Sequence, residues 1–273
     1  MIVSYCITCK NRIGHLQQTL RANLDAEADD PMVEFVLLNY QSEDGLAEWI
    51  QTNFAAEIAS GRLVHAYHTP APFFRMAHAK NLAHRIAGGE ILCNLDADNF
   101  LPRGYAQMVR KAFAGAKDRI LVARRPNSLL MVLDRLDRRF LRLRSQPSGL
   151  GGRIALPRDL FTRLGGYDEA LSAWGGDDLD ITVRARDAGA RVLTIPQAMW
   201  GKVIQHENET RVSNLSAADK AVSKTRMSRT FLTELQEFRR AVSKRHDSLA
   251  NQGSGFGQGH VVINFGLREQ DFH

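Results

Sequence analysis

Two acidic stretches of the chain contain residue types that could carry out chemistry. The first, NLDADNF, places Asp96 and Asp98 on either side of one small residue. In an extended chain, side chains two residues apart point the same way, so both carboxylates would face one space. Two carboxylates held together favour a cation between them, and Mg²⁺ or Mn²⁺ would suit a site that also binds a diphosphate. Taken alone, the pair could equally be a turn that ends a strand.

The second stretch, AWGGDDLD, combines an aromatic residue, two glycines and several carboxylates. Trp174 offers an apolar face to a sugar ring, and Gly175 and Gly176 would let a substrate approach the backbone. Asp177 and Asp178 could instead begin a helix, where acidic residues interact favourably with the macrodipole. That alternative does not explain the Trp-Gly-Gly before them, so we expect this stretch to be part of a functional site.

The elements that must position these residues alternate regularly in the first half of the chain. We expect strands at 2–7, 34–39, 62–68, 90–96 and 119–124, and helices at about 15–28, 46–58, 76–87 and 103–117. The strands are almost continuously apolar, which indicates a parallel sheet covered by helices on both faces. The predicted fold class is therefore α/β. In such sheets, ligands bind at the carboxyl ends of the strands, where Asp96 and Asp98 lie.

After Pro126 the alternation gives way to other elements. The pattern predicts an amphipathic helix at 129–144, a glycine-rich turn with a short strand, a helix from about Asp178 to Gly189, a strand at 191–195, a polar helix at about 216–247 and an edge strand at 260–265. Asp180 and Arg184 lie one turn apart on the Asp178 helix, so we expect a surface ion pair between them.

These stretches together resemble the glycosyltransferases of the GT-A fold. The first half shares the opening strand with CKNR, the turn LNYQSED, the helix start AKN and the Asp-X-Asp pair. The second half, GGRIALPRDLFTRLGGYDEALSAWGGDDLD followed by VIQH, is similar to the β-1,4-galactosyltransferase type with its Trp-Gly-Gly-Glu-Asp-Asp signature. The resemblance implies a mostly parallel, Rossmann-like central sheet flanked by helices. It also implies a donor-binding half at 1–125, an acceptor and catalytic half at 126–210, and a helical extension with a tail at 211–273.

The same resemblance implies a donor site for a UDP-sugar and a metal ion. The implied metal ligands are Asp98 and His206, and imidazole favours Mn²⁺. Val203 stands where relatives often have Met, so Mg²⁺ could also serve. The implied nucleotide-binding residues are Asn11, Arg12, Asn39, Asp44, Lys80, Asn81 and Asp96.

By the same resemblance, Asp178 is the general base of an inverting transfer. It would take the proton of an acceptor hydroxyl as that oxygen attacks the anomeric carbon and UDP leaves. Asp177 stands where relatives have Glu, so the sugar could be another hexose or an N-acetylhexosamine rather than galactose. The implied substrate-binding residues are Gly152, Trp174, Gly175, Gly176 and Asp177.

Several alternatives stay open at this point. The acceptor could be a glycan, a lipid-linked sugar, a protein or a small molecule, and the chain could also be a non-catalytic nucleotide-sugar or glycan-binding relative. The net charge of +6 and the arginines of 134–144 also fit a transferase that acts on nucleic acid, or a peripheral membrane contact through 129–144. The sequence has no long apolar run and no basic segment before its first apolar one, so we expect a cytoplasmic protein, with or without membrane association.

Overall fold

The computed structural model describes residues 1–123, 152–205, 209, 212–228, 249–252 and 255–273. The predicted helix at 129–144, the part of the predicted polar helix after residue 228 and the candidate ligand His206 lie outside the described residues.

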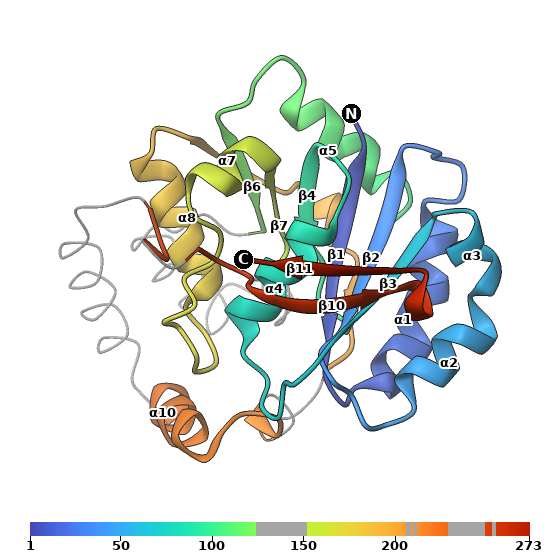
Figure 1. The fold of residues 1–273 in the computed structure, drawn as a ribbon. Helices are drawn as coiled ribbons and strands as arrows, with labels where there is room; N and C mark the ends of the chain where they lie inside the picture. Colours follow the sequence, from blue (N-terminus) through green and yellow to red (C-terminus); the bar gives the residue numbers. More distant parts are fainter. Residues whose placement is uncertain (124–151, 206–208, 210–211, 229–248, 253–254) are drawn as a thin grey trace.

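The described elements follow the predicted alternation through the first half of the chain (Figure 1). The strands are β1 (Val3–Cys9), β2 (Val33–Asn39), β3 (Leu63–His68), β4 (Ile91–Asn94), β5 (Asn99–Phe100), β6 (Arg119–Val122), β7 (Ile154–Pro157), β8 (Arg191–Thr194), β9 (Lys202–Val203), β10 (Gly259–Ile263) and β11 (Arg268–Phe272). The α-helices are α1 (Ile13–Ala26), α2 (Leu46–Asn53), α3 (Ala55–Ala59), α4 (Met76–Ile86), α5 (Tyr105–Phe113), α7 (Arg158–Arg163), α8 (Asp177–Asp187) and α10 (Ala217–Ser228). Two 3₁₀ turns are η1 (Gln197–Met199) and η2 (Asn264–Gly266).

Nine of the described strands form one sheet in the order β11-β10-β3-β2-β1-β4-β7-β6-β8. The strand β1 is near its centre and pairs in parallel with β2 and β4, and β2 pairs in parallel with β3. Within the described part, β7 and β10 run antiparallel to both of their neighbours. The prediction of a mostly parallel α/β sheet is therefore confirmed.

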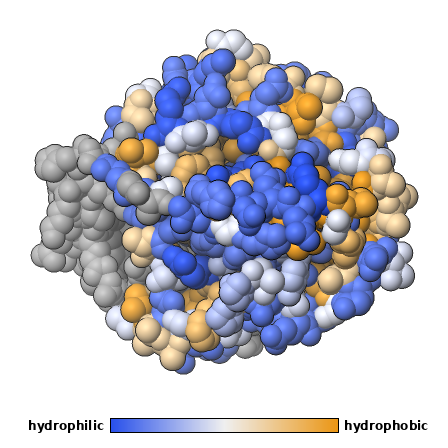
Figure 2. Space-filling view, in the orientation of Figure 1, coloured by the Kyte–Doolittle hydropathy of each residue, from blue (hydrophilic) through white to orange (hydrophobic). Residues whose placement is uncertain are grey.

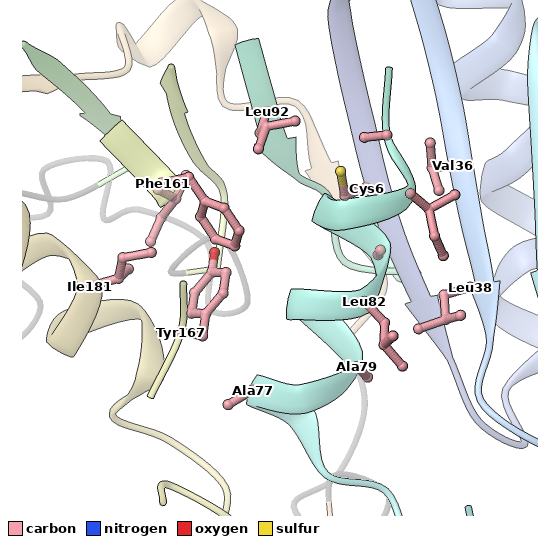
Figure 3. Packing of buried hydrophobic residues seen from close by; sticks show 14 of the residues in the cluster. Cys6, Val36, Leu38, Ala77, Ala79, Leu82, Leu92, Phe161, Tyr167 and Ile181 are labelled. Atoms are coloured by element: carbon pink, nitrogen blue, oxygen red, sulfur yellow. The ribbon is translucent and has the colours of Figure 1, made fainter. Parts of the chain in front are cut away.

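Two hydrophobic clusters, one on each face of the sheet, show why the strands are apolar throughout. On one face, alternate residues of β1 such as Tyr5 and Ile7 pack with apolar residues of α1, α2 and α5. On the other face, Cys6 belongs to a cluster that also contains apolar residues of α4, α7 and α8 (Figure 3). Burial on both faces removes apolar surface from water and stabilises the layered arrangement.

The helix ends follow local backbone chemistry. In α1, Leu16, Leu20 and Leu24 are four residues apart and buried, and the first amide, Ile13 N, donates to Asp44 Oδ2 at 2.8 Å. The helix α8 starts after Gly176, whose φ of 104° favours glycine.

Two predicted elements differ from the structure. The helix expected at 46–58 is broken at Phe54, which is buried against Trp49, and this produces the separate helices α2 and α3. The strand expected at the sheet edge near 260–265 is the inner strand β10, because β11 covers it. The charged residues of β11 do not alternate with apolar ones, so no strand was predicted there.

The last two strands join the sheet formed by the first half of the chain rather than extending beyond it. Residues Val261, Val262 and Ile263 of β10 pair antiparallel with β3. The outer strand β11 has an exposed, polar sequence, and the face of the molecule that it crosses is largely hydrophilic (Figure 2). Charged side chains on an edge strand disfavour pairing with other chains.

Candidate active site

A cavity of about 380 Å³ opens at the carboxyl ends of β1 and β4, as expected for an open α/β sheet. Its walls come from parts of the sequence that are far apart. It is lined by Thr8, Lys10, Arg12, Phe74, Met76, Lys80, Asp96, Ala97, Asp98, Gly152, Trp174, Gly175, Asp177, Asp178 and Asn214.

The Asp-X-Asp pair follows β4 directly and forms the acidic floor of this cavity. Leu95 N donates to Cys6 O, which fixes the segment beside β1. Burial raises the pKa of the Asp96 carboxyl, the positive charge of Lys80 opposes this rise, and the negative charge of Asp98 adds to it. Asp98 is almost buried, and its Oδ1 accepts a hydrogen bond from Asn99 Nδ2 at 2.7 Å.

The chain segment just before His206 lies against this pair. The short strands β5 and β9 pair antiparallel, and Ile204 N donates to Asp98 O at 2.8 Å. Ile204 precedes His206 by two residues, so the backbone of this segment is tied to the Asp98 carbonyl.

Gly152 also lines the cavity, and its backbone lies very close to the Asp96 carboxylate. A Cβ atom at this position would lie 2.5 Å from Asp96 Oδ2, so any side chain here would require Asp96 to move. The neighbouring Arg153 anchors the strand, because its guanidinium is buried and donates to Trp200 O and Asn99 Oδ1. At Gly152 the backbone therefore lies directly against the Asp96 carboxylate.

The acidic first turn of α8 also lines the cavity. Lys80 Nζ lies 2.6 Å from Asp177 Oδ2 and 2.7 Å from Asp178 Oδ1, so one ammonium group of α4 joins both carboxylates of α8. Lys80 and Asp177 are buried, whereas 29% of the Asp178 side chain is exposed. The helix N-terminus, which favours negative charge, is the second feature that stabilises this acidic cluster.

The surroundings of Asp178 change its acidity. Loss of hydration raises its pKa to about 7, the neighbouring charge of Asp177 adds to the rise, and Lys80 opposes it. A carboxylate with a pKa near the working pH is well suited to accept a proton during a reaction.

The Trp174 loop is fastened to α10. Trp174 N donates to Ser223 Oγ at 2.9 Å, and Ser172 Oγ donates to Asp219 Oδ1 at 2.5 Å. Asn214, just before α10, donates from Nδ2 to Lys10 O at 2.8 Å. This segment therefore ties the Trp174 side of the cavity to the end of β1.

Of the predicted site residues, the structure brings Arg12, Lys80, Asp96, Asp98, Gly152, Trp174, Gly175, Asp177 and Asp178 to the cavity wall. Gly176 lies directly beside that wall, as the residue before α8.

Four of the predicted nucleotide-binding residues are not among the residues that line the cavity. Asn81 is buried, and its amide is used by Tyr167 and Glu169. Asn11 and Asn39 accept hydrogen bonds from backbone amides of the loop after β2, and Asp44 accepts one from the first amide of α1. Polar residues in a turn often satisfy the turn itself.

Several cavity residues were missed in the sequence. Lys10 is buried, and its Nζ donates to Gln41 O at 2.9 Å and Ala71 O at 2.6 Å. Its place next to Asn11 and Arg12 in the CKNR motif was an available signal. Phe74, Met76 and Asn214 had no such signal, because only the folded chain places them at the cavity.

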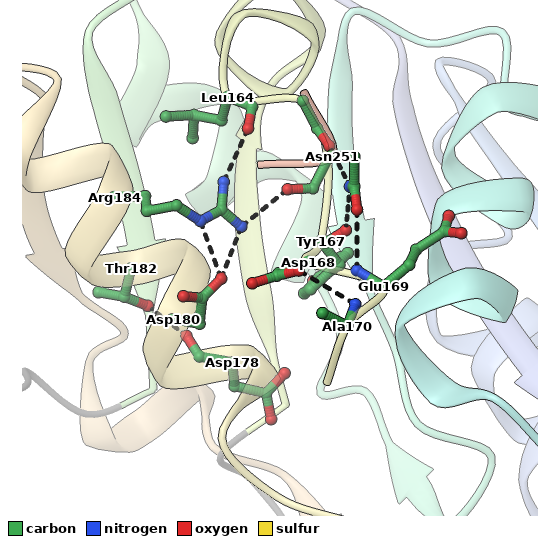
Figure 4. A network of polar contacts seen from close by, with 12 residues as sticks. Leu164, Tyr167, Asp168, Glu169, Ala170, Asp178, Asp180, Thr182, Arg184 and Asn251 are labelled. Carbon is green, nitrogen blue, oxygen red and sulfur yellow. Dashed lines mark hydrogen bonds and ion pairs between the residues drawn. The ribbon is translucent and has the colours of Figure 1, made fainter. Parts of the chain in front are cut away.

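The ion pair between Asp180 and Arg184 is confirmed, but its expected place on the surface is wrong. The distance from Arg184 Nη2 to Asp180 Oδ2 is 2.8 Å, and the two side chains are only 2% and 8% exposed. Arg184 also donates to Leu164 O and Gly166 O (Figure 4). The pair is buried because α8 packs against the loop that follows α7.

The acidic floor has a donor set that fits a divalent cation. Asp98 and Asp96 supply carboxylate oxygens, and the raised pKa of Asp96 shows that its negative charge is poorly compensated by the protein. Among the described residues, no group of three His, Cys, Asp or Glu side chains comes together, so a further ligand would have to come from elsewhere.

No described helix has the length and apolar character needed to cross a bilayer.

Similarity to curated proteins is confined to short stretches. A probable N-acetylgalactosaminyltransferase 9 from Caenorhabditis elegans is 37% identical over 59 residues, which is 22% of this chain and 10% of that protein. Validoxylamine A glucosyltransferase from Streptomyces hygroscopicus subsp. limoneus is 36% identical over 64 residues, which is 23% of this chain and 14% of that protein. The chain thus matches only a small part of the length of each relative.

The fold is shared with solved glycosyltransferase structures. The mannosyltransferase PcManGT from Pyrobaculum calidifontis, in complex with GDP-Man and Mn²⁺, superposes with a TM-score of 0.58 at 20% identity. That match covers 89% of this chain and 70% of the other. GalNAc-T7 with UDP, GalNAc and Mn²⁺ gives a TM-score of 0.56 at 16% identity and covers 89% and 54% of the two chains.

Two family models match the sequence itself. The model "N-terminal domain of galactosyltransferase" matches residues 138–209, a range that includes the Trp174 stretch. The model "Glycosyl transferase family 2" matches residues 4–165, which is more than half of the chain and spans β1 to α7. The sheet, the cavity at its carboxyl edge and this match agree, and the chain therefore belongs to glycosyl transferase family 2.

Proposed function

We propose that the protein is an inverting, metal-dependent glycosyltransferase that moves a hexose or N-acetylhexosamine from a UDP-sugar to an acceptor hydroxyl. The observation that carries this proposal is that one cavity contains both Asp98, from the end of β4, and Asp178, from the start of α8. A site of this kind needs a cation for the diphosphate and a separate carboxylate for the acceptor.

The donor side of the proposal rests on the charges along the end of β1 and β4. Asp98 would hold a divalent cation, with His206 as a further ligand, and Mn²⁺ or Mg²⁺ would neutralise diphosphate charge when bound. Lys10 and Arg12 add positive charge to the same cavity, where a diphosphate would be stabilised. The solved neighbours named above hold Mn²⁺ and either GDP-Man or UDP with GalNAc, which supports a nucleotide-sugar here.

The acceptor side rests on Asp178 and Trp174. The acceptor hydroxyl would attack the anomeric carbon while Asp178 takes its proton, and the bond between that carbon and the phosphate oxygen would break with its electrons leaving on UDP. Because attack comes from the face opposite the leaving group, the configuration inverts. Trp174 would pack against a sugar ring.

The test compares Asp178→Asn with Asp187→Asn, an exposed carboxylate near the end of the same helix. Hydrolysis or transfer is followed as UDP release from a panel of UDP-sugars with Mn²⁺ and a mixture of simple sugar acceptors. We expect Asp178→Asn to lower kcat by about 100- to 10,000-fold, because a general base contributes that much, and Asp187→Asn to leave it unchanged.

A binding measurement separates the two halves of the proposal. A thermal-shift titration with UDP and Mn²⁺ should raise the Tm of the wild type and of Asp178→Asn alike, but not that of Asp98→Ala. If Asp178→Asn retains full activity, the assigned base is wrong. If UDP binds but no sugar is ever transferred or hydrolysed, the chain is a non-catalytic nucleotide-sugar-binding relative instead.

A further inference from the structure

We propose that Lys80 is a positioning residue that holds one oxygen of Asp178 and thereby aims the other at the acceptor hydroxyl. This inference rests on the proposed function, because it assumes that Asp178 is the base. It differs from the expectation that Lys80 binds the nucleotide, where its charge would complement that of the diphosphate.

The contacts of Lys80 are made to the protein rather than to solvent. Its side chain is 2% exposed, and its Nζ donates to Asp178 Oδ1 and to Asp177 Oδ2. In the part of the chain that the structure describes, no hydrogen bond reaches Asp178 Oδ2. One carboxylate oxygen is therefore held and the other is left to receive a proton.

Asp177 is the second carboxylate that holds Lys80. It is buried, and its contact with Lys80 Nζ fixes the position of the ammonium group beside Asp178. The ring of Tyr167 lies 5.0 Å from Lys80 Nζ and closes the remaining side. A flexible lysine side chain is thus held in one position by three neighbours.

The charges that face Asp178 come from three elements. Lys80 lies on α4, Asp177 is the preceding residue of α8, and Asp96 follows β4. Lys80 favours the ionised form of Asp178, whereas the two aspartates disfavour it. Removing Lys80 or Asp177 should therefore shift the acidity of the base in opposite directions, which a purely structural role would not do.

The experiment measures kcat and kcat/KM against pH for four proteins. They are the wild type, Lys80→Met, Asp177→Asn and the double variant Lys80→Met/Asp177→Asn. Activity requires ionised Asp178, so the wild type should lose activity as the pH falls through about 7. We expect this acidic limb to move by about one to three pH units, upward in Lys80→Met and downward in Asp177→Asn.

The double variant separates a loss of stability from a loss of catalysis. Lys80→Met leaves two carboxylates without their cation and should lower the Tm, whereas adding Asp177→Asn restores the net charge of the cluster and should recover the Tm. We expect kcat of the folded double variant to stay about 100-fold below the wild type, because nothing holds Asp178 Oδ1. Recovery of wild-type kcat would overturn the proposal.

A binding control distinguishes the rival role of Lys80. Calorimetry with UDP and Mn²⁺ should give the double variant a Kd within about three-fold of the wild type, since the net charge of the cluster is unchanged. A Kd raised ten-fold or more with unchanged kcat would overturn the proposal in favour of diphosphate binding. If Asp178→Asn is inactive but both acidic limbs stay unshifted, the positioning role fails while the proposed function stands.

Discussion

Gly152 shows how a single methyl group can decide the geometry of the cavity. Because Gly152 has no side chain, Asp96 can lie against the backbone just before β7. A Cβ atom at this position would lie 2.5 Å from Asp96 Oδ2. That contact could be relieved only if Asp96 moved. The conformation of the acidic floor therefore depends on this glycine.

We expect Gly152→Ala to lower kcat/KM on the order of 100-fold, because a displacement of about 1 Å is enough to disturb a reacting geometry. The matched control is Gly14→Ala on α1, where a Cβ atom would meet nothing within 4 Å. It should leave kcat/KM unchanged and slightly raise the Tm, since alanine is the better helix former. Steady-state kinetics and a thermal melt measure both effects. Unchanged kinetics of Gly152→Ala would show that Asp96 adapts without loss.

At the scale of the elements, α8 carries the proposed base and is itself held by Arg184. The guanidinium is buried, and it joins Asp180 of the same helix to Leu164 O and Gly166 O of the preceding loop (Figure 4). Breaking such a buried pair leaves Asp180 uncompensated, and the two carbonyls lose their donors.

Arg184→Met should therefore lower the free energy of unfolding by about 3 to 5 kcal/mol, as measured by chemical denaturation. Arg186→Met is the matched control, because Arg186 pairs with Asp187 at an exposed position on the same helix. Its effect should stay within about 0.5 kcal/mol. Equal effects of the two substitutions would mean that the buried network does not anchor α8.

For the whole molecule, the C-terminal strands extend the sheet beyond β3. Val261 and Ile263 of β10 and Phe272 of β11 are buried in the core on the α4 face. Without these strands, β3 would become an open edge with part of that core exposed. Such an edge pairs readily with other chains.

A chain that lacks residues 259–273 should consequently melt at a lower temperature and form larger species in light scattering. The control is Leu267→Ser in the turn between the two strands, where the side chain is 82% exposed. That substitution should change neither the Tm nor the particle size. A truncated chain that stays monodisperse with an unchanged Tm would show that β10 and β11 are dispensable.

The sequence by itself determined the central sheet and the two acidic stretches on which the proposed function rests. Continuous apolar runs predicted the parallel strands around β1, because a strand that is buried on both faces is apolar along its whole length. The local spacing of Asp96 and Asp98 at a strand end, and of Trp174 before Asp177 and Asp178, marked two parts of one cavity. These signals are local, so a single sequence can show them.

Only the tertiary structure decided which distant residues share these contacts. Nothing in the sequence pairs Lys80 with Asp178, because 98 positions separate them and the contact depends on how α4 and α8 pack. The same holds for Arg184, whose depth depends on the loop that covers α8. It also holds for β11, whose polar sequence becomes a strand only because β10 offers it hydrogen bonds. The local pattern of apolar and polar residues determines where a helix or strand forms. The burial and charge pairing of its side chains depend on distant residues that only the folded chain brings close.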